Sequence, residues 1–160
     1  MSIDPIKILK KNGIGVMPTD TIYGLVGSAL SKKAVQRIYE VRKRELDKPF
    51  IVLISGISEL ERFGVKVSAT HLKLLKILWS LDKAWDKLGP ISIILPLLHG
   101  KQIVQKFNYL HRGNKTLAFR LPKGKRLRNF LKITGPLVAP SANIAGLPSA
   151  KNITEAKKYF

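Results

Sequence analysis

Hydroxyl and carboxylate side chains stand together in "PTDTIYGL", residues 18–25, directly after a short apolar run. Thr19, Asp20 and Thr21 offer hydrogen-bond donors and acceptors that could hold a small polar ligand. Proline, aspartate and glycine are also ordinary turn residues, so the stretch fits a polar turn equally well. Ligand sites in α/β folds usually lie in short loops at strand ends. The stretch is therefore a candidate ligand loop that needs support from elsewhere in the chain.

Three other polar motifs also lie beside an apolar run. Ser92 belongs to "GPIS" before "IILPL", Arg120 ends the run "TLAFR", and Ser141 and Asn143 follow "PLVA". Loops from several strands of an open α/β sheet converge at one edge, where ligands bind. We therefore expect these side chains and the "PTDT" motif to form one site.

Basic residues cluster at "RKR", residues 42–44, with Lys48 four positions further on. The chain contains neither a G-x-x-x-x-G-K-[ST] loop nor a G-x-G-x-x-G turn after a strand. A bound nucleotide would therefore need side chains to hold its phosphates, and arginine matches phosphate oxygens well. A solvated helix end, which suits the helix dipole, is the simpler alternative for "RKR".

Composition narrows the class of protein. Lys and Arg number 29 against 10 Asp and Glu, a formal charge of +19 that favours a polyanionic partner or a phosphorylated ligand, although lysines can simply solvate a surface.

The chain has no cysteine, and its three histidines (His71, His99 and His111) lack metal-ligand spacing, so we expect no metal site made by the protein. No apolar run reaches the roughly 20 residues of a membrane span, and no signal-peptide core is present, so we expect a cytoplasmic protein.

The apolar periodicity predicts helices and strands in alternation, and hence an α/β fold in one domain. Helices are expected at residues 5–12, 31–44, 68–81 and 126–133, with Asp4 and Ser31 as N-caps. Strands are expected at residues 14–17, 49–54, 91–97, 116–122 and 136–141. "PTDTIYGL" is expected to be a loop after the first strand.

Five motifs in order, "PTDTIYGL", "YEVRKR…KPFIVLI", "GPISIIL", "LAFRLP" and "APSANIAGLPS", resemble the YrdC/Sua5 family over about residues 13–160. The resemblance implies a single YrdC-like domain over residues 1–160, with a twisted mixed β-sheet and flanking helices around a basic concave cleft. It also implies a nucleotidyltransferase, L-threonylcarbamoyladenylate synthase. That enzyme makes threonylcarbamoyl-AMP from ATP, L-threonine and bicarbonate for the t6A37 modification of tRNA.

The family's motifs assign roles to residues at matching positions. Thr21, Tyr23 and Arg120 would bind L-threonine, with Arg120 on its carboxylate. The catalytic candidates are Arg42, Arg44, Ser141 and Asn143, and the expected ATP contacts are Arg44, Lys48, Ser92, Ser141, Asn143 and Ser149. Arg42 stands where the family has a lysine, and Ser92 where it usually has a threonine. Mg²⁺ would be held mainly through the phosphates of ATP.

The family domain normally continues past the position of Phe160 with a segment that closes the substrate pockets. We therefore expect a C-terminally short domain in which water reaches the site and turnover is slow or absent. Two alternatives remain open: a non-catalytic module that binds tRNA or double-stranded RNA through the basic cleft, and a domain that transfers carbamoyl groups within a larger assembly. For the enzyme, the expected downstream partner is the t6A transferase machinery.

Overall fold

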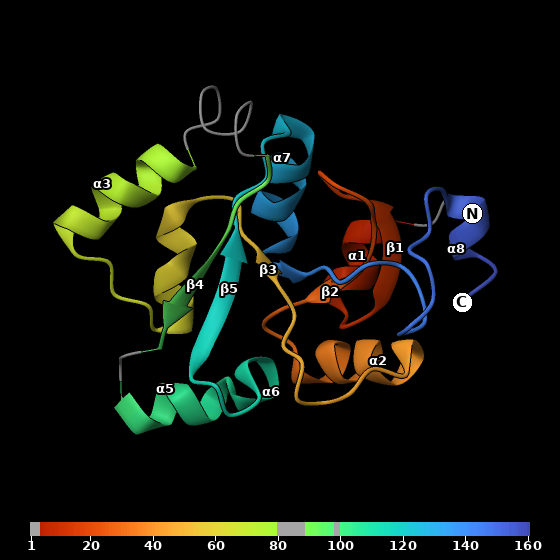
Figure 1. Cartoon of the computed structure of the whole chain (residues 1–160), viewed down its shortest axis with the longest axis horizontal. Coiled ribbons are helices and arrows are strands. Elements are labelled where there is room, and N and C mark those ends of the chain that lie inside the picture. The colour runs from red at the N-terminus through yellow and green to blue at the C-terminus, as the bar shows by residue number, and fades with distance from the viewer. Residues whose placement is uncertain (1–3, 80–88, 98–99) are drawn as a thin grey trace.

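The computed structural model describes residues 4–79, 89–97 and 100–160 of the chain. Figure 1 shows one sheet with helices arranged around it. In chain order the elements are α1 (Pro5–Lys10), β1 (Ile14–Pro18), β2 (Tyr23–Ser28), α2 (Lys32–Arg42), β3 (Val52–Leu53), the 3-10 helix η1 (Ile57–Phe63), α3 (Ala69–Leu78), β4 (Ser92–Pro96), α5 (Gly100–Lys106), α6 (Asn108–His111), β5 (Thr116–Arg120), α7 (Lys125–Thr134), β6 (Leu137–Val138) and α8 (Ile153–Ala156).

Within the described residues the sheet has six strands, in the order β1-β2-β6-β3-β5-β4. Among these strands only β3 and β5 run parallel, and the other neighbouring pairs are antiparallel. The register places Arg120 opposite Leu53 on one side and Ser92 on the other. The sheet is mixed, as expected, and its central pairings join segments that lie far apart in the sequence.

Apolar side chains cover both faces of the sheet, which is why an α/β arrangement forms. The larger core packs α2, η1, α3 and α6 against one face, with Ile38, Phe63 and Phe119 fully buried. A smaller core under α1 and α7 covers the other face around Leu9 and Leu131. A third cluster, formed by Ala142, Ala150 and Ala156, holds the C-terminal segment near β1.

Helix ends follow the local chemistry of the sequence. The Asp4 carboxylate accepts hydrogen bonds from the backbone N–H groups of Ile6 and Lys7, and the Ser31 hydroxyl accepts one from Ala34, so both predicted N-caps are confirmed. Two predicted helix ends were wrong. Asn12 (φ 62°) lies beyond α1, and Lys43 (φ 50°) is the left-handed C-cap that ends α2 before Arg44.

The predictions located every strand except β2, and they overestimated the length of each located strand except β1. β3 and β6 have two residues each, because the flanking residues of the predicted runs 49–54 and 136–141 leave the sheet. The prediction of "PTDTIYGL" as a loop was wrong for its second half, since Tyr23 begins β2 and pairs with Pro18 in a hairpin. Two glycines in "YGLVGS" hid that strand. The predicted helix at 68–81 is α3, and residues 80–81 lie outside the described residues.

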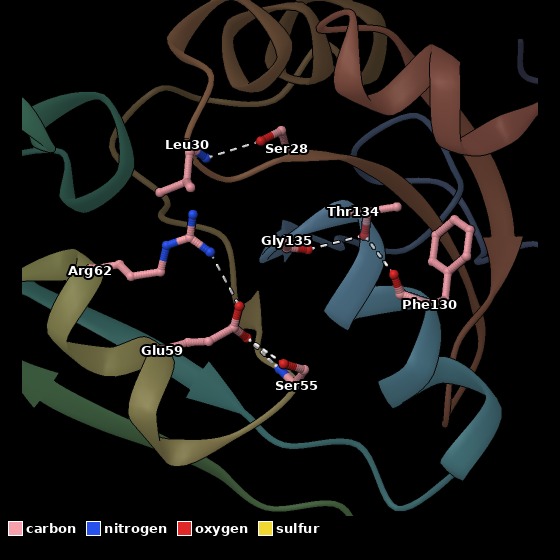
Figure 2. Close-up of polar contacts among 8 residues, drawn as sticks. All are labelled: Ser28, Leu30, Ser55, Glu59, Arg62, Phe130, Thr134 and Gly135. Carbon is pink, nitrogen blue, oxygen red and sulfur yellow. Dashed lines mark hydrogen bonds and ion pairs between the residues drawn. The ribbon is translucent and has the colours of Figure 1, made fainter.

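Side-chain hydrogen bonds complete the turns that end β3 and α7 (Figure 2). The Glu59 carboxylate accepts from the backbone N–H and the hydroxyl of Ser55, at 2.6 and 3.0 Å, and pairs with Arg62 at 3.5 Å. The Thr134 hydroxyl lies 3.0 Å from the carbonyl of Phe130 and 3.1 Å from that of Gly135. These contacts fix the short connections between the sheet and its helices.

The remaining sequence expectations have simple outcomes. His111 is buried and bonded to the carbonyl of Val104, and His71 is exposed. His99 lies outside the described residues. Within the described ranges, no helix is both long enough and apolar enough to cross a membrane.

Close packing of α2 on β2 leads to a testable expectation. A Cβ at Gly27 would lie 3.0 Å from Ile38 Cδ1, 3.2 Å from Ile14 Cγ2 and 3.3 Å from Ala34 Cβ. We expect Gly27→Ala to lower the free energy of unfolding by about 1–3 kcal/mol, because the core must shift to admit the methyl group. Gly15→Ala is the matched control, since its Cβ would meet nothing within 4 Å. Urea denaturation measures both variants, and equal stabilities would contradict the packing described.

Candidate functional site

The tip of the β1–β2 hairpin presents the first hydroxyl groups of the site. The Thr19 hydroxyl donates to the carbonyl of Ile22 at 2.6 Å and accepts from the backbone N–H of Thr21 at 3.3 Å. The two threonine hydroxyls lie 3.3 Å apart. Thr19 therefore shapes the tip from within, while Thr21 is exposed.

Asp20, Ser92 and Arg120 form the first polar cluster, which we call the Asp20–Arg120 cluster. β4 and β5 place Ser92 and Arg120 opposite each other, and Arg120 Nε donates to Ser92 Oγ at 3.0 Å. Arg120 Nη1 lies 3.7 Å from Asp20 Oδ1, an ion pair between side chains that are 16% and 5% exposed. Burial raises the pKa of the Asp20 carboxyl, and the charge of Arg120 counteracts this only in part. The hairpin tip thus contacts the far end of the sheet.

Arg42, Ser141 and Asn143 form the second cluster, which we call the Arg42 cluster. The Arg42 side chain, 3% exposed, donates from Nε to the carbonyl of Asn143 at 3.0 Å. Its Nη2 donates to Ser141 Oγ and Asn143 Oδ1, each at 3.1 Å. The Asn143 amide in turn donates to the carbonyls of Ile144 and Leu147. A single guanidinium therefore fixes the orientation of both the hydroxyl and the amide.

Burial also changes the electrostatics of Arg42. Desolvation, followed by the nearby charge of Arg44, lowers the pKa of Arg42 to about 10. At neutral pH the guanidinium remains positively charged. The Nη1 atom of Arg42 is buried and has no hydrogen-bond partner among the described residues. The cluster is consequently a buried cation held by neutral acceptors.

The start of β2 connects the two clusters. Ala142 N donates to the carbonyl of Tyr23 at 2.8 Å, and Leu25 N donates to the carbonyl of Pro140 at 2.9 Å. Gly24 is bridged to Ser141. A Cβ at Gly24 would lie 2.9 Å from Thr19 Cγ2, so glycine allows the hairpin tip and the Ser141 loop to approach closely. The Ser141 loop is therefore anchored two residues from Thr21.

The other predicted site residues lie outside these clusters. Arg44 follows α2, donates from Nε to the carbonyl of Lys48 at 3.2 Å and places its guanidinium over the ring of Phe50. The Lys48 ammonium pairs with Glu45 on the surface. Ser149 is half-buried in the segment after Asn143. The structure joins Arg42, Ser141 and Asn143 directly, and it joins Ser92 and Arg120 directly.

A groove of about 690 Å³ lies between α1, β1 and α7. Its lining is mostly apolar, including Ile8, Met17 and Phe130, and it also contains Thr19 and Asp20. The sequence did not predict this groove, and the family resemblance assigned no specific role to Asp20, which was only part of the candidate ligand loop. The signal was present, because Asp20 is a carboxylate within a hydroxyl motif in a chain poor in acids.

The fold and the two clusters define an α/β protein whose candidate site combines buried charges with hydroxyl and amide groups. A model of the Sua5/YciO/YrdC family, described as telomere recombination, matches residues 7–160. The chain belongs to this family, as the five sequence motifs suggested.

Curated relatives include proteins named threonylcarbamoyl-AMP synthase. The one from Pyrococcus abyssi is 30% identical over 95% of this chain and 41% of the relative, and the one from Bacillus subtilis is 32% identical over 89% and 38%. The chain thus spans about two fifths of the length of these relatives.

Solved structures agree with the fold. Sua5 of P. abyssi complexed with L-threonine superposes with a TM-score of 0.75 at 27% identity, covering 96% of this chain and 42% of that one. YciO of E. coli, at 24% identity, has a TM-score of 0.71 over 97% of this chain and 70% of its own. The expected twisted mixed sheet with flanking helices is therefore confirmed.

The Arg42 cluster supplies a stability test. Arg42→Ala removes three hydrogen bonds and leaves buried acceptors on Ser141 and Asn143. Hydrogen bonds to charged groups are worth about 1.5–3 kcal/mol each, partly offset here by relief of a buried charge, so we expect a loss of about 2–4 kcal/mol. Arg37→Ala, exposed on the same helix, should change stability by less than about 0.5 kcal/mol. Equal effects in chemical denaturation would mean that the Arg42 side chain does not hold the Ser141 loop.

Proposed function

We propose that this chain is a threonylcarbamoyl-AMP synthase, a nucleotidyltransferase that joins ATP, L-threonine and bicarbonate and releases pyrophosphate and water. The observation that carries the proposal is the hydrogen-bonded link from the Thr21 hairpin through Tyr23 to the Ser141 loop. This link supports an amino-acid pocket beside a nucleotide pocket. The synthase names of the relatives, and the L-threonine in a related structure, favour this function over an RNA-binding module.

The amino-acid pocket is assigned to Thr21, Tyr23 and Arg120. The bond from Arg120 Nε to Ser92 fixes the guanidinium and leaves its outer nitrogens to bind the carboxylate of threonine. The exposed Thr21 hydroxyl contacts the amino acid from the hairpin tip. Tyr23, half-buried at the start of β2, forms the wall next to the Ser141 loop.

The nucleotide pocket is assigned to Arg44, Lys48, Ser92, Ser141, Asn143 and Ser149. Arg44 uses Nε within the chain, and the rest of its guanidinium is suited to phosphate oxygens. The Lys48–Glu45 pair is solvent-exposed, and such pairs contribute little, so a phosphate can displace Glu45. Arg42 acts from behind, because its bonds orient Ser141 and Asn143.

The reaction makes one bond and breaks one bond at phosphorus. The neutral amine of L-threonine first attacks the carbon of bicarbonate, so that a C–N bond forms and a C–O bond breaks as water leaves. A carbamate oxygen of the resulting N-carboxythreonine then attacks the α-phosphorus of ATP, the new O–P bond forms, and the bond to the β-phosphate oxygen breaks as pyrophosphate leaves. Preorganised cations stabilise the charge that develops on the phosphate oxygens. Mg²⁺, when bound, would neutralise phosphate charge. Since the described residues contain no cluster of three or more His, Asp or Glu side chains, the phosphates would hold it.

The proposed product is the activated intermediate for t6A37 modification of tRNA, so we assign the reaction to the cytoplasm, upstream of the t6A transferase machinery. The charge of +19 is consistent with a polyanionic substrate such as ATP. It also allows tRNA or double-stranded RNA to bind as an additional partner, which salt-dependent binding would reveal.

Binding calorimetry tests the assignment. With ATP–Mg²⁺ present, L-threonine should bind, and D-threonine and L-serine should bind more weakly, because each disturbs the fit of the hydroxyl or the methyl group. ATP–Mg²⁺ should bind by itself. Tight, salt-sensitive binding of RNA without any detectable binding of threonine would contradict the synthase and favour the RNA-binding module.

A further inference from the structure

The carboxylate of Asp20 is buried without hydrogen bonds. Its side chain is 5% exposed, and neither oxygen has a hydrogen-bond partner among the described residues. The neighbouring hydroxyl of Thr19 is already committed to the carbonyl of Ile22. A buried carboxylate without hydrogen-bond donors is costly, so the free chain carries an acceptor that a donor on a ligand can satisfy.

Arg120 does not donate a hydrogen bond to the Asp20 carboxylate. Its Nη1 lies 3.7 Å from Asp20 Oδ1, an ion-pair distance that is too long for a hydrogen bond. Its Nε is directed to Ser92 instead. The result is a carboxylate and a guanidinium side by side, each with unused hydrogen-bonding capacity toward the other.

Neighbouring opposite charges of this kind complement a zwitterion. An α-amino acid carries a carboxylate and an ammonium group on one carbon, and Arg120 and Asp20 offer one partner for each. Asp20 is also one of the residues that line the groove between α1, β1 and α7. Thr21, next in sequence, is exposed at the same tip.

We propose that Asp20 binds the α-ammonium group of the amino-acid substrate and so selects for α-amino acids. This inference rests on the proposed function, in which Arg120 binds the carboxylate of the same molecule. It also places Asp20 next to the nitrogen that becomes carboxylated, which makes it a specificity-determining residue at the reacting atom.

A role limited to orienting Arg120 predicts a different result. A carboxylate that held Arg120 in place would affect every ligand that uses Arg120, whether or not the ligand carries an ammonium group. A role in folding predicts that removal of the charge lowers stability. The two alternatives are therefore separable from ammonium binding by the choice of ligand and by a melting curve.

The test compares L-threonine with (R)-3-hydroxybutanoate, which keeps the carboxylate, hydroxyl and methyl groups but lacks the amine. Ligand-observed NMR titrations in the presence of ATP–Mg²⁺ cover weak binding of both. Asp20→Asn should weaken L-threonine binding by about tenfold or more, because a charge-assisted hydrogen bond is lost, and should change hydroxybutanoate binding by less than about twofold. The control is Glu61→Gln, an exposed acid on η1 whose loss changes net charge equally.

An equal loss for both ligands would overturn the inference and make Asp20 a positioning residue for Arg120. Unchanged binding of L-threonine would also overturn the inference. The Tm of Asp20→Asn should equal or exceed that of the unmodified chain, since a buried charge that Arg120 compensates only in part is removed. A lower Tm together with loss of both ligands would assign Asp20 to the fold. If the unmodified chain binds neither ATP nor L-threonine, the proposed function itself fails, and the inference fails with it.

Discussion

The buried guanidinium of Arg42 is the interaction on which the geometry of the site depends. It connects the end of α2 to the loop after β6 through hydrogen bonds to Ser141 and Asn143. The backbone carbonyl of Arg42 also accepts a hydrogen bond from Ala145 N in that loop. Because that loop is also bonded to Tyr23, the same interaction fixes the start of β2 and, through the hairpin, the tip at Thr21. A charge that is expensive to bury is tolerated because one planar group orients several polar partners at once.

Asp20 is the counterpart of Arg42 in the Asp20–Arg120 cluster. Both side chains are charged and buried, and both retain polar atoms without hydrogen bonds in the described part of the chain. Burial shifts the two pKa values in opposite directions, since it lowers the pKa of Arg42 and raises that of Asp20. Incompletely bonded charges of this kind are typical of functional sites, where a ligand completes the hydrogen bonds. These unmet hydrogen bonds lower the stability of the free chain, and they leave polar atoms that a ligand can bind.

Local signals in the sequence predicted local structure well. Asp4 and Ser31 predicted helix starts because a cap depends on a few neighbouring residues. β2 was missed because its glycines resemble turn residues, although Gly24 and Gly27 are required by close packing. The order of the motifs predicted the family and identified Ser141, Asn143 and Arg120 as candidate site residues. The burial of Arg42 and its distant partners was not predictable, since a basic helix end is usually solvated and only the tertiary fold brings residue 143 to it.

The most direct test of the account is pyrophosphate release by the purified chain, measured with ATP–Mg²⁺, L-threonine and bicarbonate supplied together and with each omitted in turn. If the two clusters form one synthase site, release requires both L-threonine and bicarbonate, and threonylcarbamoyl-AMP accumulates in step with pyrophosphate, however slow the rate. Release that is the same without threonine, or no release from a chain that binds both ATP and threonine, would contradict the account.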